Sequence, residues 1–392
     1  MLAEVAKERV QAGPSAPAWR LTLSGREITD TASEIEVVWG EEGSELTCDA
    51  VDMDSRSVDE RVVLWLGYGS ELVPYFSGHL KRPAEGGVFF SRKAQALGPL
   101  SRMAEREYME QVSYAGAYIG TALYDTALRA DNPRGTVEVV DPRSYRIDPS
   151  AEEAIFVEEV KLSEGAETLM GFAEFVAADV PGTRYGKTIF LPRPRPGAGQ
   201  KASVTYGPDH YAPKGFKPTP KDEGPYSEVI VFRRDPDGRY AVYQRAPIEN
   251  RGLKRQPKDR PYRITDFAGD ATQARQTAYD TARALGAGEF GFDLELLSIN
   301  PELARFDRIE VTRLDSRPDG THRETWACLV EEITASVASW TMSVKGGAVL
   351  AKEERVARPV IVVEPSGGVL RTAPWTMWES AGTWDTNETW EG

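Results

Sequence analysis

Histidine and cysteine, which often serve as nucleophile, base or metal ligand, are few and scattered in this sequence. The histidines are His79, His210 and His322, and the cysteines are Cys48 and Cys328. A structural zinc site needs about four such ligands at close spacing, and an α/β-hydrolase needs a histidine together with a G-x-S-x-G turn, which accompanies none of the three. We therefore predict no catalytic residue, no metal site and no cofactor, and expect that the chain is not an enzyme.

Two further motifs resemble ligand-binding loops, but their spacing does not match. Residues 197–203 (GAGQKAS) do not meet the GxxxxGK[ST] spacing of a phosphate loop, and no helical pattern follows them. The Asp-Gly turns at 235–238 and 319–320 lack the remaining carboxylates of a calcium loop. Because the chain has 61 acidic residues, carboxylate pairs arise by chance, and spacing neither supports nor excludes a glycosidase.

Tryptophans near the end of the sequence form its most unusual motif. Trp378, Trp384 and Trp390 recur every six residues, each followed by Glu or Asp, and Trp375 precedes them. An even spacing places the three indoles on one face if the segment is extended. Exposed tryptophans form an adhesive surface. We predict that Trp375, Trp378, Trp384 and Trp390 are binding residues used in assembly.

The composition is that of a globular protein with many turns. The 392 residues include 35 Gly and 26 Pro, and 41% are hydrophobic, which is enough to bury a core in two or three domains. The sequence has no run of about 18 apolar residues, so no membrane span is expected. The first residues, MLAEVAKERV, lack the apolar core of a secretory signal.

Charge is distributed unevenly along the chain. The net charge of −14 argues against non-specific affinity for nucleic acid, whose phosphates attract Lys and Arg. Residues 192–265 contain 16 basic and 8 acidic side chains, so this window carries +8 and the remainder −22. Such asymmetry indicates a solvated face or contact with an acidic partner surface, and the sequence leaves both open. Nucleic acid is the least favoured interpretation of this window, because base-stacking motifs are missing.

Alternating apolar residues predict strands between residues 18 and 100. Trp19, Leu21 and Leu23, for example, alternate with polar residues and so share one face of a strand. Six short strands are expected, at residues 19–23, 35–39, 45–51, 61–67, 72–80 and 88–90. The segments between them leave no room for crossover helices, so this region predicts a small antiparallel barrel or sandwich.

The middle of the chain predicts an α/β connector followed by a loop region. In residues 101–191, helices are expected at 119–128 and about 166–178, and strands at 136–140 and 187–191. Residues 192–264 form a Pro/Lys-rich basic loop region with one hairpin, 229–232 with 240–243. Residues 192–226 are expected to run extended over a surface without closing a core.

Residues 265–364 predict a helix and a second barrel. Asp270 caps a helix whose narrow face of Ala274, Ala278 and Ala282 suits close packing on a sheet. Strands follow at 292–296, 308–314, 324–333 and 339–345. The expected fold class is mainly β, with two antiparallel β-barrel domains, a helix–strand connector, an N-terminal arm at residues 1–17 and a Trp-rich tail at 365–392.

Three stretches carry a resemblance to a known family. They are residues 64–71 (LWLGYGSE), residues 76–80 (FSGHL), and residues 300–311 (NPELARFDRIEV), which follow the alanine-rich helix. Through them residues 18–350 resemble the tail hub family, shared by bacteriophage baseplate hub proteins and the spike-bearing proteins of contractile secretion systems. The resemblance implies a homotrimer in which two similar barrels per chain form a ring.

The same resemblance implies a structural function. The chain would be a minor tail protein, a baseplate hub that adapts the six-fold tail tube and distal tail ring to a three-fold tip and lines the DNA exit channel. Implied partners are the distal tail ring protein, the tape measure protein, other tail-tip proteins and DNA passing without sequence-specific binding, with no membrane. It would be made in the host cytoplasm and reside in the virion, at the phage tail tip.

Two other functions remain open on the sequence alone. One is a cell-wall carbohydrate-binding tail protein, whose sugar groove Trp65, Tyr68, Tyr75 and Phe76 could line, although aromatic residues at strand spacing are more often core. The other is a peptidoglycan hydrolase, which would need a cleft with a buried Glu or Asp.

Overall fold

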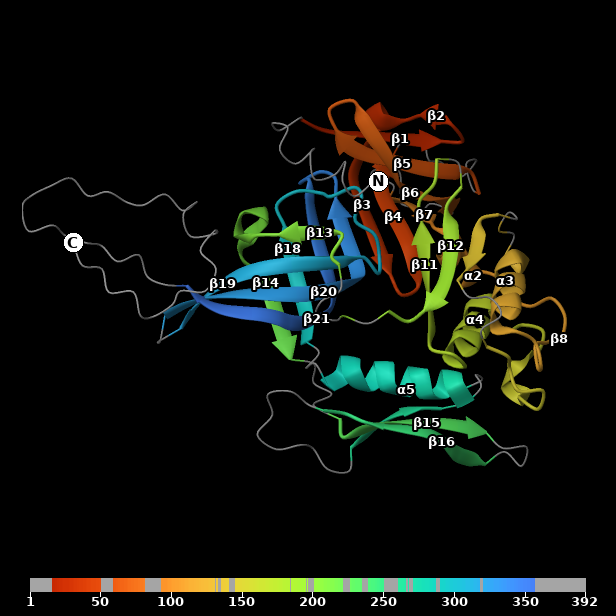
Figure 1. The fold of residues 1–392 in the computed structure, drawn as a ribbon. Helices are drawn as coiled ribbons and strands as arrows, with labels where there is room; N and C mark the ends of the chain where they lie inside the picture. Colours follow the sequence, from red (N-terminus) through yellow and green to blue (C-terminus); the bar gives the residue numbers. More distant parts are fainter. Residues whose placement is uncertain are drawn as a thin grey trace, which may run out of the picture.

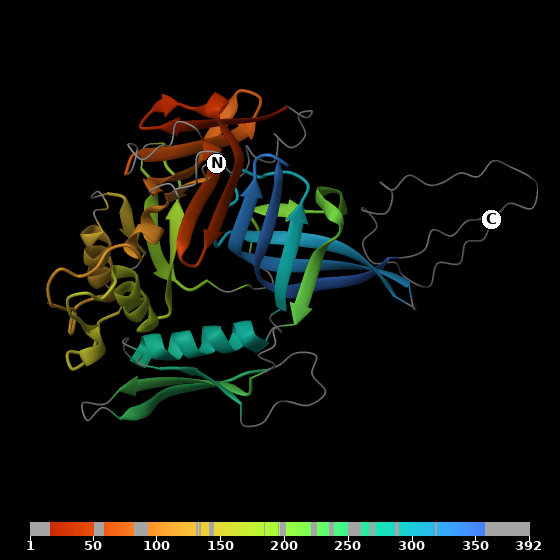
Figure 2. The same cartoon turned by 180° about the vertical axis from the view of Figure 1, so that it is seen from behind.

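The computed structural model describes most of the chain between Ala16 and Val356 (Figures 1 and 2). The described residues are 16–50, 59–81, 93–130, 132, 135–140, 145–183, 185–194, 196, 201–220, 226–234, 239–249, 260–265, 267, 271–286, 290–317 and 320–356.

Seven strands from the N-terminal part of the chain form the first strand group. They are β1 (Pro17–Leu23), β2 (Arg26–Glu27), β3 (Ala32–Gly40), β4 (Gly43–Ala50), β5 (Arg61–Tyr68), β6 (Glu71–Lys81) and β7 (Lys93–Leu97). Burial alternates with period two along β4, where Leu46 and Cys48 face the core. Five of the six predicted strands are present, and the one predicted at 88–90 lies outside the described residues.

Six strands form the second strand group. They are β13 (Val204–Tyr206), β14 (Tyr211–Pro220), β18 (Phe290–Leu296), β19 (Arg308–Arg317), β20 (Gly320–Ser336) and β21 (Thr341–Val356). The predicted hairpin between residues 308–314 and 324–333 is confirmed and is longer than expected, since β19 and β20 pair from Arg308–Leu329 to Arg317–Gly320.

The prediction that residues 192–226 cannot contribute to a core is wrong. β13 pairs in parallel with β19, β14 pairs antiparallel with β18, and Tyr206, Tyr211 and Phe216 are buried in the main core. Prolines in β14 are compatible with this role because β14 ends the strand order, and proline is tolerated on an edge strand. Composition misled the prediction here, because a proline-rich segment can still supply large aromatic residues to a core.

All 13 strands of the two groups belong to one sheet. Its order is β14-β18-β21-β20-β3-β4-β7-β6-β5-β1-β2, with β19 beside β20 and β13 beside β19. The mainly β fold class is therefore confirmed. Among the described residues, strand pairing joins the two groups and closes neither of them into a separate barrel.

The long strand β20 joins the two groups. Its first ten residues pair with β19, and residues Ile333 to Ser336 pair with β3 of the first group. A register shift between Val330 and Glu332, opposite β21, lies where β20 changes from one neighbour to the other. Extra residues of this kind bend a strand and increase its twist, which lets one strand serve two groups.

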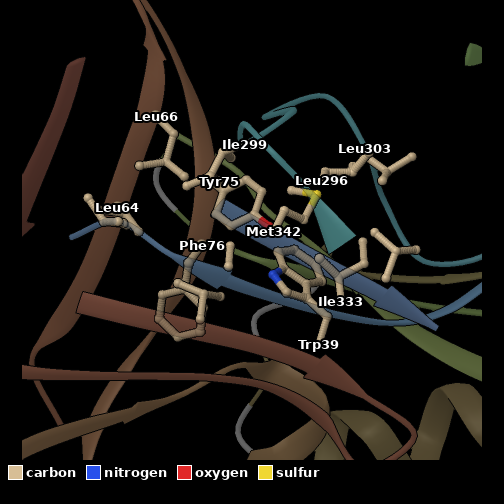
Figure 3. Close-up of a cluster of buried hydrophobic side chains, with 14 of the residues drawn as sticks. Trp39, Leu64, Leu66, Tyr75, Phe76, Leu296, Ile299, Leu303, Ile333 and Met342 are labelled. Carbon is tan, nitrogen blue, oxygen red and sulfur yellow. The ribbon is translucent and has the colours of Figure 1, made fainter. Parts of the chain in front are cut away.

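A single hydrophobic cluster extends through both strand groups (Figure 3). Trp39 and Tyr75 of the first group meet at 5.8 Å between ring centroids in an edge-on contact. Leu296, Ile333 and Met342 of the second group lie in the same cluster. Because the apolar surfaces of the two groups are buried against each other, their separation would expose a large part of both cores to water.

Helices and short strands between the two groups form the connector. They are α2 (Pro99–Met103), β8 (Val112–Ser113), α3 (Ile119–Arg129), β9 (Val137–Val139), β10 (Ile155–Phe156), α4 (Leu162–Gly171), β11 (Phe175–Val180) and β12 (Lys187–Pro192). The helix predicted at 119–128 and the strands predicted at 136–140 and 187–191 are confirmed.

The helix predicted at 166–178 is only half right. It begins earlier and ends at Gly171, and residues 175–180 instead form β11, which pairs with β12. Glu174 adopts a left-handed φ of 53°, which ends the helical path. The apolar run that suggested one long helix is therefore divided between a helix and a buried strand, and only the presence of β12 as a partner distinguishes the two.

A small unit inserted before the last strands consists of one helix on a three-stranded sheet. Its elements are β15 (Glu228–Arg234), β16 (Tyr240–Pro247), β17 (Pro261–Ile264) and α5 (Ala271–Gly286). The predicted alanine face of α5 is confirmed, since Ala274, Ala278 and Ala282 pack against Val229 and Val231 of β15. Figure 1 shows α5 on one face of this sheet, which we call the insertion sheet, and the opposite face turned away from the rest of the molecule.

Tyr68, at the end of β5, links the two strand groups by hydrogen bonds. Its hydroxyl donates to the carbonyl of Ile299 at 2.8 Å and accepts from Nε1 of Trp340 at 3.0 Å. The two rings also meet edge-on at 5.7 Å. Ile299 and Trp340 lie on segments that flank strands of the second group, so one side chain connects both groups.

Replacing Tyr68 with Phe is expected to lower the free energy of unfolding by about 1–2 kcal/mol, because the Ile299 carbonyl and the Trp340 indole each lose their partner. Chemical denaturation of the full chain measures this difference. The control is Tyr279→Phe, which removes a hydroxyl from a 44% exposed tyrosine on α5 and should change stability by less than about 0.5 kcal/mol. Equal stabilities of the two variants would contradict the linking role of Tyr68.

Candidate functional site

Trp375, Trp378, Trp384 and Trp390 all lie outside the described residues, which end at Val356. Their role in assembly stays a prediction.

The three histidines lie on three different elements. His79 is in β6, His210 ends a single 3-10 turn, and His322 is in β20, where its Nδ1 lies 3.0 Å from a carboxylate oxygen of Glu353. His210 is held locally, since its Nδ1 accepts a hydrogen bond from the Gly207 amide. Within the described ranges no group of three or more His, Cys, Asp or Glu side chains could hold a metal ion.

The cysteines are structural. Cys48 and Cys328 are both buried in the main core, and neither forms a disulfide. Burial, helped by the charge of Asp49, raises the pKa of Cys48 to about 12, and burial also raises the pKa of Cys328. Because the thiolate is the reactive form, both side chains behave as small hydrophobic residues.

The aromatic residues considered for a sugar groove serve the fold instead. Tyr75 and Phe76 are buried in the main core, and Tyr68 links the two strand groups. Trp65 lies under the guanidinium of Arg20, whose central carbon is 4.7 Å from the ring centroid. This sequence-based candidate for carbohydrate binding therefore does not form a groove.

What the structure brings together is a joint between the two strand groups and the connector. Asp179 of β11 is buried, and its carboxylate accepts hydrogen bonds from the Ser44 amide at 3.0 Å and the Ser44 hydroxyl at 2.8 Å. It also accepts from the Leu100 amide at 2.9 Å and the Thr188 hydroxyl at 3.2 Å. Burial raises the pKa of Asp179, and these four hydrogen bonds oppose that shift. One carboxylate thus ties the connector to β4 and to the start of α2.

Arg305 makes the second half of this joint. Its Nε donates to the Glu331 carbonyl at 2.7 Å, and its Nη1 donates to the carbonyls of Gly40 at 2.6 Å and Ala177 at 3.0 Å. These three carbonyls belong to β20, β3 and β11, so one guanidinium connects the second strand group, the first strand group and the connector. Burial lowers the pKa of Arg305, and the nearby charges of Glu41, Asp179 and Glu331 oppose this.

This arrangement can hold the two strand groups and the connector in fixed positions. The hydrogen bonds given for Asp179 and Arg305 all go to backbone or hydroxyl groups of the chain itself. The sequence carried one usable signal for it, an Asp inside the apolar strand sequence FVAADV, because an acidic residue at a buried position must find several donors. Across the part of the chain that the structure describes, no helix has both the length and the apolar content needed to cross a membrane.

Comparison with known proteins finds likeness in structure only. No family model and no curated protein matches the sequence. The tail protein from Neisseria meningitidis MC58 matches with a TM-score of 0.54 and 10% identity, over 85% of this chain and 96% of that one. The 43 kDa tail protein of prophage MuSo2 from Shewanella oneidensis matches with a TM-score of 0.50 and 12% identity, over 85% and 98%. A type VI secretion system component from E. coli matches with a TM-score of 0.44 and 11% identity, over 88% and 80%.

At such low identities, the likeness shows the fold alone. The chain has the fold of solved phage tail proteins and spans nearly the whole length of two of them. The resemblance to the tail hub family, which the sequence indicated through residues 64–80 and 300–311, is confirmed at the level of fold.

Replacing Arg305 with Met should remove the guanidinium donor from three backbone carbonyls and lower the free energy of unfolding by about 2–4 kcal/mol. Arg305→Lys should lose less, because an ammonium group can still reach one of the carbonyls. The matched control is Arg283→Met, at an 84% exposed side chain on α5, with an expected change below about 0.5 kcal/mol. Denaturant titration of the three variants measures this order, and an Arg305→Met protein as stable as the control would contradict it.

Asp179→Asn should destabilise the protein most at low pH. The protonated carboxyl of Asp179 still accepts hydrogen bonds from the Ser44 and Leu100 amides, one on each oxygen. Asn has a single side-chain oxygen, so one of these two hydrogen bonds is lost, at a cost of about 1–3 kcal/mol. Because the folded pKa lies above the unfolded value of about 3.9, the stability contributed by Asp179 is fully present at low pH and is lost as pH rises through the folded pKa.

Unfolding free energies of the two proteins between pH 4 and 8 should therefore converge as pH rises. Asp280→Asn, at a 52% exposed side chain, is the control and should follow the wild type at every pH. A difference between wild type and Asp179→Asn that widens with pH would show that the carboxylate is the favoured form in the folded protein.

Proposed function

We propose that this protein is a structural component of a bacteriophage tail and that it catalyses no reaction. The observation that carries the proposal is the fold, which is shared over 96% and 98% of two solved tail proteins. It is supported by what the described residues contain, since their buried polar groups serve packing joints and their histidines and cysteines do not form a reactive site. The virion is the corresponding location.

The finer proposal is a trimeric hub at the tail tip. Each chain contributes two groups of mainly antiparallel strands in one sheet, so three chains would present six groups around a ring. Such a ring can meet a six-fold tail tube and distal tail ring on one side and a three-fold tip on the other. An acidic lining, drawn from the −22 outside residues 192–265, would let DNA pass without gripping its phosphates.

The partners follow from this position. They would be two further copies of the chain, the distal tail ring protein, the tape measure protein and the next tail-tip protein. We propose that residues 365–392 dock on one of these neighbours through Trp375, Trp378, Trp384 and Trp390, as an added strand or an apolar anchor.

The test compares the full chain with a chain truncated after Glu364. Light scattering and negative-stain imaging should show three-fold particles of about three chain masses for both proteins, because the truncation removes none of the described strands. Tail assembly in infected cells should recruit the next tip component with the full chain and not with the truncated one.

Two results would count against the proposal in different ways. A monomer at every concentration would remove the trimeric hub, and normal tails from the truncated chain would remove the role of the tryptophans. Turnover of cell-wall material by the purified protein would favour the hydrolase alternative.

A further inference from the structure

Two antiparallel segments of the connector expose apolar residues among acidic ones. β8 pairs with β10, and the Tyr108 amide donates to the Val160 carbonyl. The backbones of Glu107 and Lys161 form an isolated antiparallel β-bridge, so residues 105–113 and 152–161 run side by side. Met109 is 87% exposed and Val157 is 53% exposed. We call this pair of segments the acidic ribbon.

The charge of the acidic ribbon is strongly one-sided. Its acidic residues are Glu105, Glu107, Glu110, Glu152, Glu153, Glu158 and Glu159, and its basic residues are Arg106 and Lys161. All nine side chains are exposed. Glu105 lies 2.9 Å from Lys81 and Glu110 lies 3.2 Å from Arg129, and Glu153 also has a partner. The remaining four glutamates still outnumber the two basic residues, so the ribbon remains acidic.

The uncovered face of the insertion sheet has the opposite character. Val229 and Val231 face α5, so Ile230 and Phe232 point to the other side, together with their register partners Arg245, Arg263 and Val242. Tyr240 contacts Phe232 edge-on at 6.3 Å, and the exposed fractions of Tyr240 and Val242 are 50% and 47%. Ile230 is only 5% exposed, so the exposed apolar part of this face is the strip formed by Phe232, Tyr240 and Val242 beside exposed arginines.

The charge of this face is basic. Arg239, Arg245 and Arg263 are exposed on or beside it, and its one strand glutamate, Glu228, is already paired with Arg245 at 3.3 Å. This basic face would attract the glutamates of the acidic ribbon and would repel the ribbon's two basic residues. Apolar patches flanked by opposite charges are complementary both in the surface they bury and in the sign of their fields.

We propose that the acidic ribbon of one copy docks on the uncovered face of the insertion sheet of a neighbouring copy. The inference rests on the proposed ring and names the contact that closes it. The two surfaces belong to different units of the chain, as Figures 1 and 2 show, with the ribbon at β8 on the connector and the sheet face beyond α5. A contact between two different surfaces is head-to-tail, and it forms a closed ring when its rotation closes.

Charge swapping tests this pairing directly. The sheet variant is Arg239→Glu with Arg263→Glu, and the ribbon variant is Glu107→Arg with Glu158→Arg. Each should raise the apparent dissociation constant of the full-length oligomer by about tenfold or more at low salt, as facing charge pairs do, and the chain carrying all four changes should recover most of the affinity. The control, Lys201→Glu with Lys217→Glu, changes net charge as the sheet variant does, at exposed sites outside both surfaces.

Cross-linking adds a readout that does not depend on stability. A chain with both Met109→Cys and Val242→Cys should form covalent oligomers with a short bismaleimide, and either single variant should not. Cys48 and Cys328 are buried and should not react.

The outcomes separate this inference from the proposed function. A trimer that both charge variants leave unchanged would overturn the inference and leave the hub intact. Weakening by both variants without recovery in the combined chain would also overturn it, since the two surfaces would then face other partners. A wild-type protein that is monomeric at every concentration would remove the ring itself.

Discussion

The rest of the structure depends on one constraint, which is that the single strand β20 pairs with strands of both groups. One strand pairs with β19 along its first part and with β3 along its last part, and at the transition its register against β21 shifts. At such a transition some backbone N–H and C=O groups have no partner on a neighbouring strand. Where these groups are buried, they need other hydrogen-bond partners. Arg305 meets this need by donating to the Glu331 carbonyl at the transition and to Gly40 and Ala177 across it.

Because of this joint, the two strand groups and the connector are held together by both packing and directed hydrogen bonds. The main hydrophobic cluster, whose residues run from Leu21 to Ala348, packs the two strand groups against each other. Asp179, Arg305 and Tyr68 add direction, because hydrogen bonds to specific donors and carbonyls tolerate less sliding than apolar contacts do. A subunit of a ring needs fixed angles between its strand groups and its connector, since an error in one copy is repeated in every copy.

The predictions from sequence succeeded where the signal was local. Period-two alternation identified the strands of the first group, and the spacing of Ala274, Ala278 and Ala282 identified the packing face of α5. They failed at residues 166–178, where an apolar run fits a helix or a buried strand equally well, and at 192–226, where proline content hid two strands of the main sheet. In both places the outcome depended on a partner strand, β12 or β18, that local pattern does not contain.

The sequence by itself determined the mainly β class, the acidic balance with its basic window, the scarcity of reactive side chains and the resemblance to tail hub proteins. These properties depend on residue type and short-range periodicity, which any reader of the chain can evaluate. Only the tertiary structure decided that both strand groups share one sheet and that Arg305 and Asp179 hold the connector to it. The hydrogen bond between Arg305 and Gly40 joins positions 265 residues apart. The chain has many arginines that could donate to these carbonyls, and only the packing of the whole chain places Arg305 beside them.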